Sequence, residues 1–438
     1  MRKILQDIVG INERNTARAG YVWNTIAGLI NASESVILLI VITRISGIEE
    51  AGIVSIAFTI SNLFLSIGKF GMRNYQVTDI SKKYTFVDYR ASRIITTISM
   101  IAVCVLYLLH RVIVGDYTLY KAFTVLFICG LYTVEAYEDI YVGLYQRNGR
   151  LDVGMRIFSI RWIIALVILI IILMLSHNIV IASLISLLFS LIVFSVLNNT
   201  VIQANELKCE VHRDNNFKRS FNLLKSCTNL FIISFLSYYI TSAPKYAIDK
   251  YMTDEVQACY GFVAMPVFVI GLLNSFIYQP QMVHMSIEWK NNEMVQFITR
   301  IWRQIIIILL ITIVCLIGAF VVGIPVLSLL YGINLQEYKP ELLILLCSGG
   351  GLAIVGFLMV ILIIMREQKA LVVGYIITAT LAFTLSGIVV KKYGTLGASI
   401  FSFVLSLVLS LILGGFIVYY MKEKKQGLTS SILSVIVN

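Results

Sequence analysis

The fold class is decided by residues 166–194, which read LVILIIILMLSHNIVIASLISLLFSLIVF. This stretch holds the end of one long apolar run and the start of another, and only Ser176 to Asn178 separate them. A membrane-spanning helix needs about 20 mostly apolar residues. The sequence therefore predicts two spans, over 157–176 and 179–201, joined by a very tight turn.

The same pattern continues along the chain. Of the 438 residues, 58% are apolar and only 13% charged, whereas soluble domains carry roughly 25% charged residues. This composition excludes a soluble globule and a disordered chain, and it predicts an all-α polytopic membrane protein of about twelve helices. The other expected spans are 19–43, 51–70, 94–114, 119–144, 227–248, 258–280, 303–324, 341–365, 370–390 and 396–420.

The distribution of basic residues predicts the orientation. With both termini in the cytoplasm, 27 of the 35 Lys and Arg fall on the cytoplasmic side. Such a bias is the signature of membrane topology. The net charge of +11 therefore follows from topology, and no soluble basic domain is left to bind nucleic acid.

An even number of spans in each half predicts two six-helix lobes with the same orientation. We expect an N-terminal lobe over 1–201, a cytoplasmic linker over 202–226, a C-terminal lobe over 227–420 and a cytoplasmic tail over 421–438. A basic residue, an acidic pair and a small residue precede both the second and the eighth span, which is a weak sign of an internal repeat.

Polar residues recur at helical spacing within several spans. In the second span Ser55, Thr59, Asn62, Ser66 and Lys69 share one face, and Arg73 would extend that face toward the cytoplasm. Polar groups are costly in hydrocarbon, so these faces should meet protein or water. The candidate substrate-binding residues of a polar cleft are Asn24, Asn31, Arg44, Asn62, Lys69, Arg73, Tyr238, Lys245 and Asn274.

Other interpretations of these residues stay open. Serine and threonine stripes are also typical of closely packed helices, as expected for Ser402, Ser406, Ser410 and Gly414 in the last span. Lys69 and Lys245 lie near span ends and would also reach the membrane interface as snorkelling side chains.

Carboxylates within spans are a further signal. Acids at membrane depth often form proton or cation relays; alternatively, those of the fourth span pair with Arg147, Arg150 or Lys69 to hold the structure together. The candidates for ion coupling are Glu34, Glu135, Glu138, Asp139 and Asp249. Pro266 lies inside the eighth span and predicts a bend there, either a flexing point or a static kink.

No catalytic or cofactor motif occurs. The sequence lacks a P-loop, H-E-x-x-H and G-x-S-x-G, and its seven cysteines show no C-x-x-C spacing. We therefore expect no enzyme activity, no cofactor and no metal site.

Short segments in a fixed order resemble the polysaccharide-export branch of the MOP superfamily, which contains Wzx-type O-antigen flippases. They are Thr43–Gly47 with Ala51 and Gly52, Gly71–Val77, Gly143–Gln146, Ala243–Asp249, Gly323–Pro325 with Leu329–Gly332, and Lys392–Gly394 with Leu396–Ala398.

The resemblance implies a two-lobed, twelve-helix flippase in the bacterial cytoplasmic (inner) membrane. Its implied substrate is a polyprenyl-diphosphate-linked oligosaccharide, such as an O-antigen repeat unit for lipopolysaccharide, and its partners would be membrane lipids and other polysaccharide-assembly proteins. Two alternatives remain at this point: a MATE-type multidrug or cation antiporter, and an O-antigen polymerase. The short external loops disfavour the polymerase.

Overall fold

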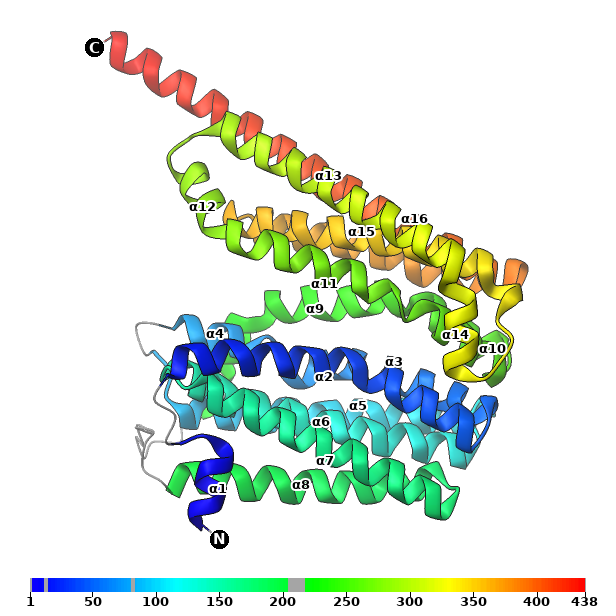
Figure 1. Ribbon diagram of the computed structural model, residues 1–438. Helices are drawn as coiled ribbons and strands as arrows, with labels where there is room; N and C mark the ends of the chain where they lie inside the picture. Colours follow the sequence, from blue (N-terminus) through cyan, green and yellow to red (C-terminus); the bar gives the residue numbers. More distant parts are fainter. Residues whose placement is uncertain (1, 12–14, 80–82, 204–216, 438) are drawn as a thin grey trace. The chain divides into compact units, whose positions relative to one another are not determined.

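The computed structural model describes residues 2–11, 15–79, 83–203 and 217–437, and helices run through nearly all of them (Figure 1). Eleven of these helices are long and apolar enough to cross a membrane. The last one, α16 (Gln368–Val437), is interrupted by non-helical backbone at Gly394 (φ 62°, ψ −147°). Because this break falls between two predicted spans, the described chain contains about twelve spans. The prediction of an all-α multi-pass membrane protein is confirmed.

Two compact units make up the chain, and each is described by itself. The N-terminal unit comprises residues 1–238 and 252–258, and the C-terminal unit comprises 239–251 and 259–438. The seventh span is thus divided between the units, although the sequence analysis assigned it wholly to the second lobe. Most of the predicted linker, 204–216, lies outside the described residues, and α16 continues as helix through the predicted tail. The functional lobe boundaries stay a prediction.

The N-terminal unit is a bundle of long helices. The helices are α1 (Arg2–Val9), α2 (Thr16–Ile45), α3 (Ile48–Lys69), α4 (Met72–Thr78), α5 (Phe86–Ile113), α6 (Leu119–Arg147), α7 (Leu151–Ser176) and α8 (Ile179–Gln203), followed by the first part of α9 (Phe217–Tyr251). In this unit α2 packs on α7, α3 on α6, and α7 on α8 (Figure 1). Helix α3 is largely buried, and α6 packs on α3, α4, α5, α7 and α8.

The C-terminal unit contains the rest of α9 and most of α10 (Asp254–Ala264). Its other elements are α11 (Val267–Tyr278), the 3₁₀ turn η1 (Gln279–Gln281), α12 (Met282–Lys290), α13 (Met294–Gly318), the π-helical segment η2 (Ala319–Gly323), α14 (Ile324–Tyr331), the 3₁₀ turn η3 (Gln336–Tyr338), α15 (Lys339–Ile364) and α16. The eighth predicted span is broken into α10 and α11 beside Pro266, as proline in a helix requires. The predicted bend is confirmed.

Local sequence explains where several helices begin and end. Helix α5 begins at a capping box, in which Thr85 and Asp88 each accept a hydrogen bond from the other's backbone N–H. Helix α7 ends at Ser176, where His177 takes a left-handed conformation (φ 48°), and α8 begins two residues later. The predicted tight turn is therefore confirmed.

Small residues let the helices of the C-terminal unit approach closely. A Cβ atom on Gly350 would lie 2.5 Å from Thr312 Oγ1 on α13, and one on Gly351 would lie 2.2 Å from Ser406 Oγ on α16. Ser406 is buried, and Ser410 donates a hydrogen bond to the Gly351 carbonyl (3.4 Å). The interpretation of this stripe as a packing surface is confirmed for the serines. It is wrong for Gly414, because nothing lies within 4 Å of its Cβ position.

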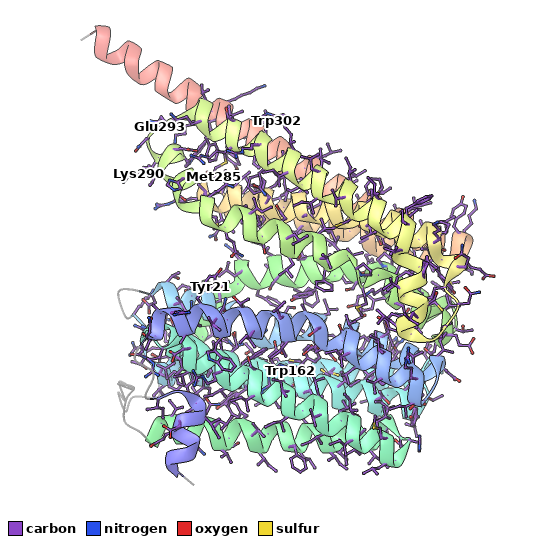
Figure 2. The ribbon with its side chains drawn as sticks, in the orientation of Figure 1. Tyr21, Trp162, Met285, Lys290, Glu293 and Trp302 are labelled. Carbon is purple, nitrogen blue, oxygen red and sulfur yellow. The ribbon has the colours of Figure 1, made fainter. Side chains whose placement is uncertain are left out.

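The exposed fractions of two tryptophan side chains distinguish a buried interior from an outer face (Figure 2). Trp162 is 1% exposed between the helices of the N-terminal unit, whereas Trp302 on α13 is 61% exposed. Exposed Ile, Leu, Val and Phe side chains continue along α13. An apolar outer face of this kind suits contact with lipid tails.

Candidate functional site

A polar cavity of about 380 Å³ lies inside the N-terminal unit, between α2, α3, α4, α6 and α7. It is the candidate site because it brings together amide, cationic and carboxylate side chains from segments far apart in the sequence. The lining residues are Asn24, Ala27, Gly28, Asn31, Ala32, Lys69, Arg73, Glu135, Asp139, Val142, Met155 and Phe158. Six of these twelve are predicted site residues, from both the substrate and the coupling groups.

A sharp break between α3 and α4 places two cations at this cavity. Helix α3 ends at Lys69 because Phe70 takes a left-handed conformation (φ 48°), and Gly71 does the same (φ 66°). The ring of Phe70 stacks on Phe231 with centroids 4.3 Å apart. Arg73 then starts a separate helix and still reaches the cavity. The predicted single helical face running on to Arg73 is therefore wrong beyond Lys69.

The rest of the predicted stripe on α3 lies elsewhere. Ser55, Thr59 and Ser66 are buried. Thr59 and Ser66 donate hydrogen bonds to carbonyls of their own helix, as Asn62 does to the Phe58 carbonyl (3.0 Å). In this structure the three hydroxyl residues meet protein, which favours the helix-packing interpretation over the cleft for them. Asn62 is half-buried and does not line the cavity.

Glu135 joins Lys69 to the interior of the unit. The Lys69 Nζ atom lies 2.6 Å from Glu135 Oε1, and Trp162 Nε1 donates a hydrogen bond to Glu135 Oε2 (3.1 Å). The carboxylate is buried, whereas the lysine side chain is 34% exposed. Lys69 is thus held in one orientation while its ammonium group still faces the cavity.

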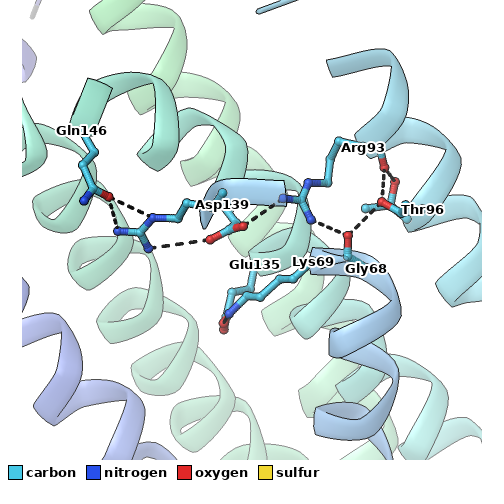
Figure 3. A network of polar contacts seen from close by, with 9 residues as sticks. Gly68, Lys69, Arg93, Thr96, Glu135, Asp139 and Gln146 are labelled. Carbon is cyan, nitrogen blue, oxygen red and sulfur yellow. Dashed lines mark hydrogen bonds and ion pairs between the residues drawn. The ribbon is translucent and has the colours of Figure 1, made fainter. Parts of the chain in front are cut away.

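Asp139 binds two arginines (Figure 3). Its Oδ2 atom lies 2.9 Å from Arg93 Nη2, and its Oδ1 atom lies 3.7 Å from Arg73 Nη1. Arg73 also donates from Nε and Nη2 to Gln146 Oε1, over 3.2 and 2.9 Å. Arg93 is fully buried and also donates to the Gly68 carbonyl. The fork of Arg73 is therefore oriented from two sides and remains 27% exposed.

Two of the short segments quoted from the sequence meet at this point. The segment Gly71–Val77 forms α4, and Gly143–Gln146 lies near the end of α6, on which α4 packs. A Cβ atom on Gly143 would lie 2.2 Å from the Gln76 side-chain oxygen and 3.4 Å from Arg73 Cγ. Glycine at this position therefore makes room for α4.

Glu138 and Glu34 lie deeper than the cavity. Glu138 Oε2 lies 2.8 Å from Arg161 Nε, both side chains are buried, and Arg161 also donates to Ser190 Oγ (3.0 Å). Glu34 is 2% exposed and accepts a hydrogen bond from Tyr132 Oη (2.5 Å). Both carboxylates bind protein groups away from the cavity, and their role as coupling residues stays a prediction.

Sequence reasoning missed three partners in this network: Arg93, Arg161 and Gln146. Arg161 carried a usable signal, because it lies four residues inside a predicted span where an unpaired charge would be costly. Arg93 directly precedes the predicted third span, so its position indicates only a basic residue in a cytoplasmic loop. Gln146 belongs to a quoted segment but had no partner that sequence spacing could identify.

Other predicted residues lie outside this cavity. Asn274 is buried in the C-terminal unit, where it donates to the Ala353 carbonyl (3.1 Å) and accepts from Gln304 Nε2 (2.7 Å). Its amide is used in helix packing, so we leave it out of the proposed site. Tyr238 and Arg44 belong to the N-terminal unit and Lys245 and Asp249 to the C-terminal unit. The functions of these four residues stay predictions.

The cavity offers a mixed chemistry. Lys69 and Arg73 supply positive charge that is oriented by carboxylates, and Asn24 and Asn31 on α2 supply exposed amides. Arginine and lysine bind phosphate oxygens through charge-assisted hydrogen bonds, and amides can both donate to and accept from sugar hydroxyls. The arrangement can therefore bind a ligand that carries both kinds of group.

Comparisons with known proteins agree on one architecture. The lipid II flippase MurJ, in an inward closed conformation, aligns with a TM-score of 0.69 over 90% of this chain and 87% of its own, at 13% identity. An inward-facing MATE-family multidrug transporter of the MOP superfamily aligns with a TM-score of 0.66 over 92% and 99%, at 12% identity. This chain has the MOP-superfamily fold. The Vibrio cholerae MATE transporter VcmN in its bent form also aligns, with a TM-score of 0.58 over 94% and 99%, at 13% identity.

Sequence comparison identifies a relative whose name states the process in which it takes part. The capsular polysaccharide biosynthesis protein CapF of Staphylococcus aureus is 23% identical over 386 residues, which cover 86% of this chain and 92% of CapF. No protein-family model matches the chain.

Proposed function

We propose that this protein is a flippase that moves a polyprenyl-diphosphate-linked oligosaccharide across the bacterial cytoplasmic membrane. The observation that carries the proposal is the cavity in which Lys69 and Arg73 face the same space as Asn24 and Asn31. The MOP-superfamily fold, which the flippase MurJ shares, and the likeness to CapF support the same substrate class. The oligosaccharide would be a repeat unit of an O-antigen, capsule or similar surface polysaccharide.

In this proposal the diphosphate competes with carboxylates for the two cations. Glu135 and Asp139 hold Lys69 and Arg73 when no substrate is present, so the cations are already oriented. An incoming diphosphate would replace part of these contacts, while Arg93 keeps Asp139 paired. The asparagines would hydrogen-bond the first sugar, and the polyprenyl tail would stay in lipid.

Transport then requires two states with different affinities for the headgroup, because binding can shift a conformational equilibrium only through such a difference. We propose that both termini lie in the cytoplasm, as the distribution of basic residues predicts, and that the cavity loads from that side. The long α7 and α8 would serve as fixed walls of the N-terminal unit.

A MATE-type antiporter remains the second candidate because such transporters share the fold. A pocket for organic cations should present unneutralised carboxylates. Both carboxylates that line the polar cavity instead contact Lys or Arg, and Glu34 is buried behind it. The pairing favours an anionic headgroup as the ligand.

The test measures export in a bacterial strain whose own copy has been deleted and replaced by variants. Lys69→Gln and Arg73→Gln should each lower surface polysaccharide about tenfold or more, because each removes a charge-assisted contact of about 1.5–3 kcal/mol. The lipid-linked precursor should accumulate on the cytoplasmic side. Lys245→Ala is measured in the same assay, because the sequence predicts Lys245 in the substrate cleft.

Lys290→Gln is the matched control. Lys290 is an exposed lysine at the end of α12, a helix that does not line the polar cavity. It should leave export and protein level unchanged. Wild-type polysaccharide in both cavity variants would contradict the proposal. Loss of resistance to cationic dyes in the deletion strain, with normal polysaccharide, would favour the antiporter.

A further inference from the structure

A second pocket lies in the N-terminal unit, where the start of α9 meets the connection between α4 and α5. It has a volume of about 520 Å³ and is separate from the polar cavity, with which it shares no lining residue. Its lining is formed by Lys83, Tyr84, Arg219, Asn222, Lys225 and Ser226. Three of these six side chains are cationic and none is acidic, so we call it the basic pocket.

The start of α9 is two-sided, which explains how the pocket forms. Leu223 and Cys227 are buried in a cluster with Met72, Tyr84 and Tyr89. Ser220, on the same side of the helix, accepts a hydrogen bond through its carbonyl from Ser92 Oγ on α5 (3.1 Å).

Its other side is polar and faces the pocket. Arg219, Asn222 and Ser226 follow helical spacing on this side, and Lys225 lies beside them. Asn222, Lys225 and Ser226 are exposed. The sequence therefore provides one face that anchors α9 in the unit and one face that is free to bind a ligand.

Arg219 is held in place across the pocket. Its Nη2 atom donates to the Lys83 carbonyl (3.0 Å), and its Nε atom lies 3.7 Å from Asp88 Oδ2. Asp88 is itself buried and occupied by the capping box with Thr85. The guanidinium is thus oriented by one neutral and one charged contact, and an oriented cation loses less conformational entropy when an anion binds.

We propose that the basic pocket binds the phosphate group of an anionic membrane lipid. The three cations match a phosphate in charge, and the polar Asn222 and Ser226 match the hydroxyls of a glycerol headgroup. Phe221, directly before Asn222 on α9, is 62% exposed. An exposed apolar ring beside cations at the end of a membrane span fits the boundary between lipid headgroups and acyl chains.

This inference does not depend on what the protein transports. The pocket lies on the side that the basic residues predict to be cytoplasmic, where anionic lipid headgroups attract such clusters. A bound headgroup would tie α9, which continues from the N-terminal unit into the C-terminal unit, to the α4–α5 connection. The pocket would therefore make protein stability depend on the lipid composition around the membrane span.

The test uses the full-length purified protein and native mass spectrometry, with phosphatidylglycerol as the probe and phosphatidylcholine as the neutral comparison. The wild type should retain phosphatidylglycerol in preference to phosphatidylcholine. Arg219→Gln and Lys225→Gln should each weaken apparent phosphatidylglycerol affinity about fivefold, because each removes a charge-assisted contact to the phosphate in the pocket.

Lys218→Gln is the matched control, because Lys218 is an exposed neighbour on the same helix that does not line the pocket. It should leave retention unchanged. Lys225→Gln protects the test against misfolding, because Lys225 is exposed and Arg219 keeps its contacts in that variant. Equal retention in the wild type and both pocket variants, or an equal loss in Lys218→Gln, would overturn the proposal.

Inorganic phosphate and glycerol 3-phosphate, added at millimolar concentration, separate the two possible sources of the phosphate group. If the pocket serves a lipid, neither should displace phosphatidylglycerol, because they lack the acyl chains that hold the lipid in the membrane. Displacement by either compound would overturn the lipid assignment and identify a site for soluble phosphates.

Discussion

Both units bury polar groups within a mostly apolar bundle, but the contacts that these groups make differ between the units. In the N-terminal unit the buried network is ionic: Glu138 pairs with Arg161, and Asp139 with Arg93. In the C-terminal unit the described buried contacts are largely neutral. Asn274 accepts from Gln304 and donates to the Ala353 carbonyl, while the buried carboxylate of Glu341 accepts a hydrogen bond from the Thr395 hydroxyl (2.8 Å).

The difference teaches where charge has a purpose other than stability. A buried ion pair often stabilises a protein no better than well-packed apolar residues would, because both ions must be desolvated. Glu135 and Asp139, which pair with Lys69 and Arg73, line the polar cavity, whereas the Glu138–Arg161 pair lies away from it. Under the proposed function, only the pairs at the cavity serve a ligand. The C-terminal unit instead gains its close packing from glycine and serine, which carry no such cost.

The largest effect is expected from breaking a buried ion pair. Arg161→Met leaves Glu138 charged and without its partner, and should lower the free energy of unfolding by about 3–5 kcal/mol. Thermal unfolding in detergent measures this loss. The double variant with Glu138→Met as well should recover most of the stability. If the single and double variants were equally unstable, the ionic account of the N-terminal unit would fail.

A smaller effect is expected from the packing of the C-terminal unit. Gly351→Ala places a methyl group 2.2 Å from Ser406 Oγ and should cost about 1–3 kcal/mol through overpacking. Adding Ser406→Gly should restore stability by removing the clash. Gly356→Ala is the control, because nothing lies within 4 Å of its Cβ position. Equal melting temperatures for Gly351→Ala and Gly356→Ala would argue against tight packing at this point.

The smallest effect is expected at an ion pair of the C-terminal unit in which only one partner is buried. Arg300 contacts Glu288; the arginine side chain is 36% exposed and that of the glutamate is 6% exposed. Glu288→Gln removes the buried charge and leaves an arginine that water can reach, so it should cost about 1 kcal/mol or less. Its melting temperature should stay close to that of the wild type, in contrast to Arg161→Met. A loss as large as that of Arg161→Met would show that burial does not separate the two classes of pair.

Much of the candidate site could be predicted from the sequence, because each helix carries its own pattern. Asn24 and Asn31 lie seven residues apart on one helical face, and both line the polar cavity. The serines and threonine of α3 show the limit of this reasoning. Periodicity identifies a polar face but does not say whether that face meets a cavity or a neighbouring helix.

By itself, the sequence determined the class of the protein, the number and place of its spans, and the tight turn at His177. Apolar length and turn residues are local properties, so a single segment contains all the information. The sequence predicts Lys69 as one possible partner of the fourth-span acids. Only the tertiary structure decided that its partner is Glu135, 66 residues away, and that Asp139 binds Arg93, 46 residues away. Such pairs depend on how each helix is rotated against its neighbours and on the left-handed break at Phe70. Both are set by the packing of the whole bundle.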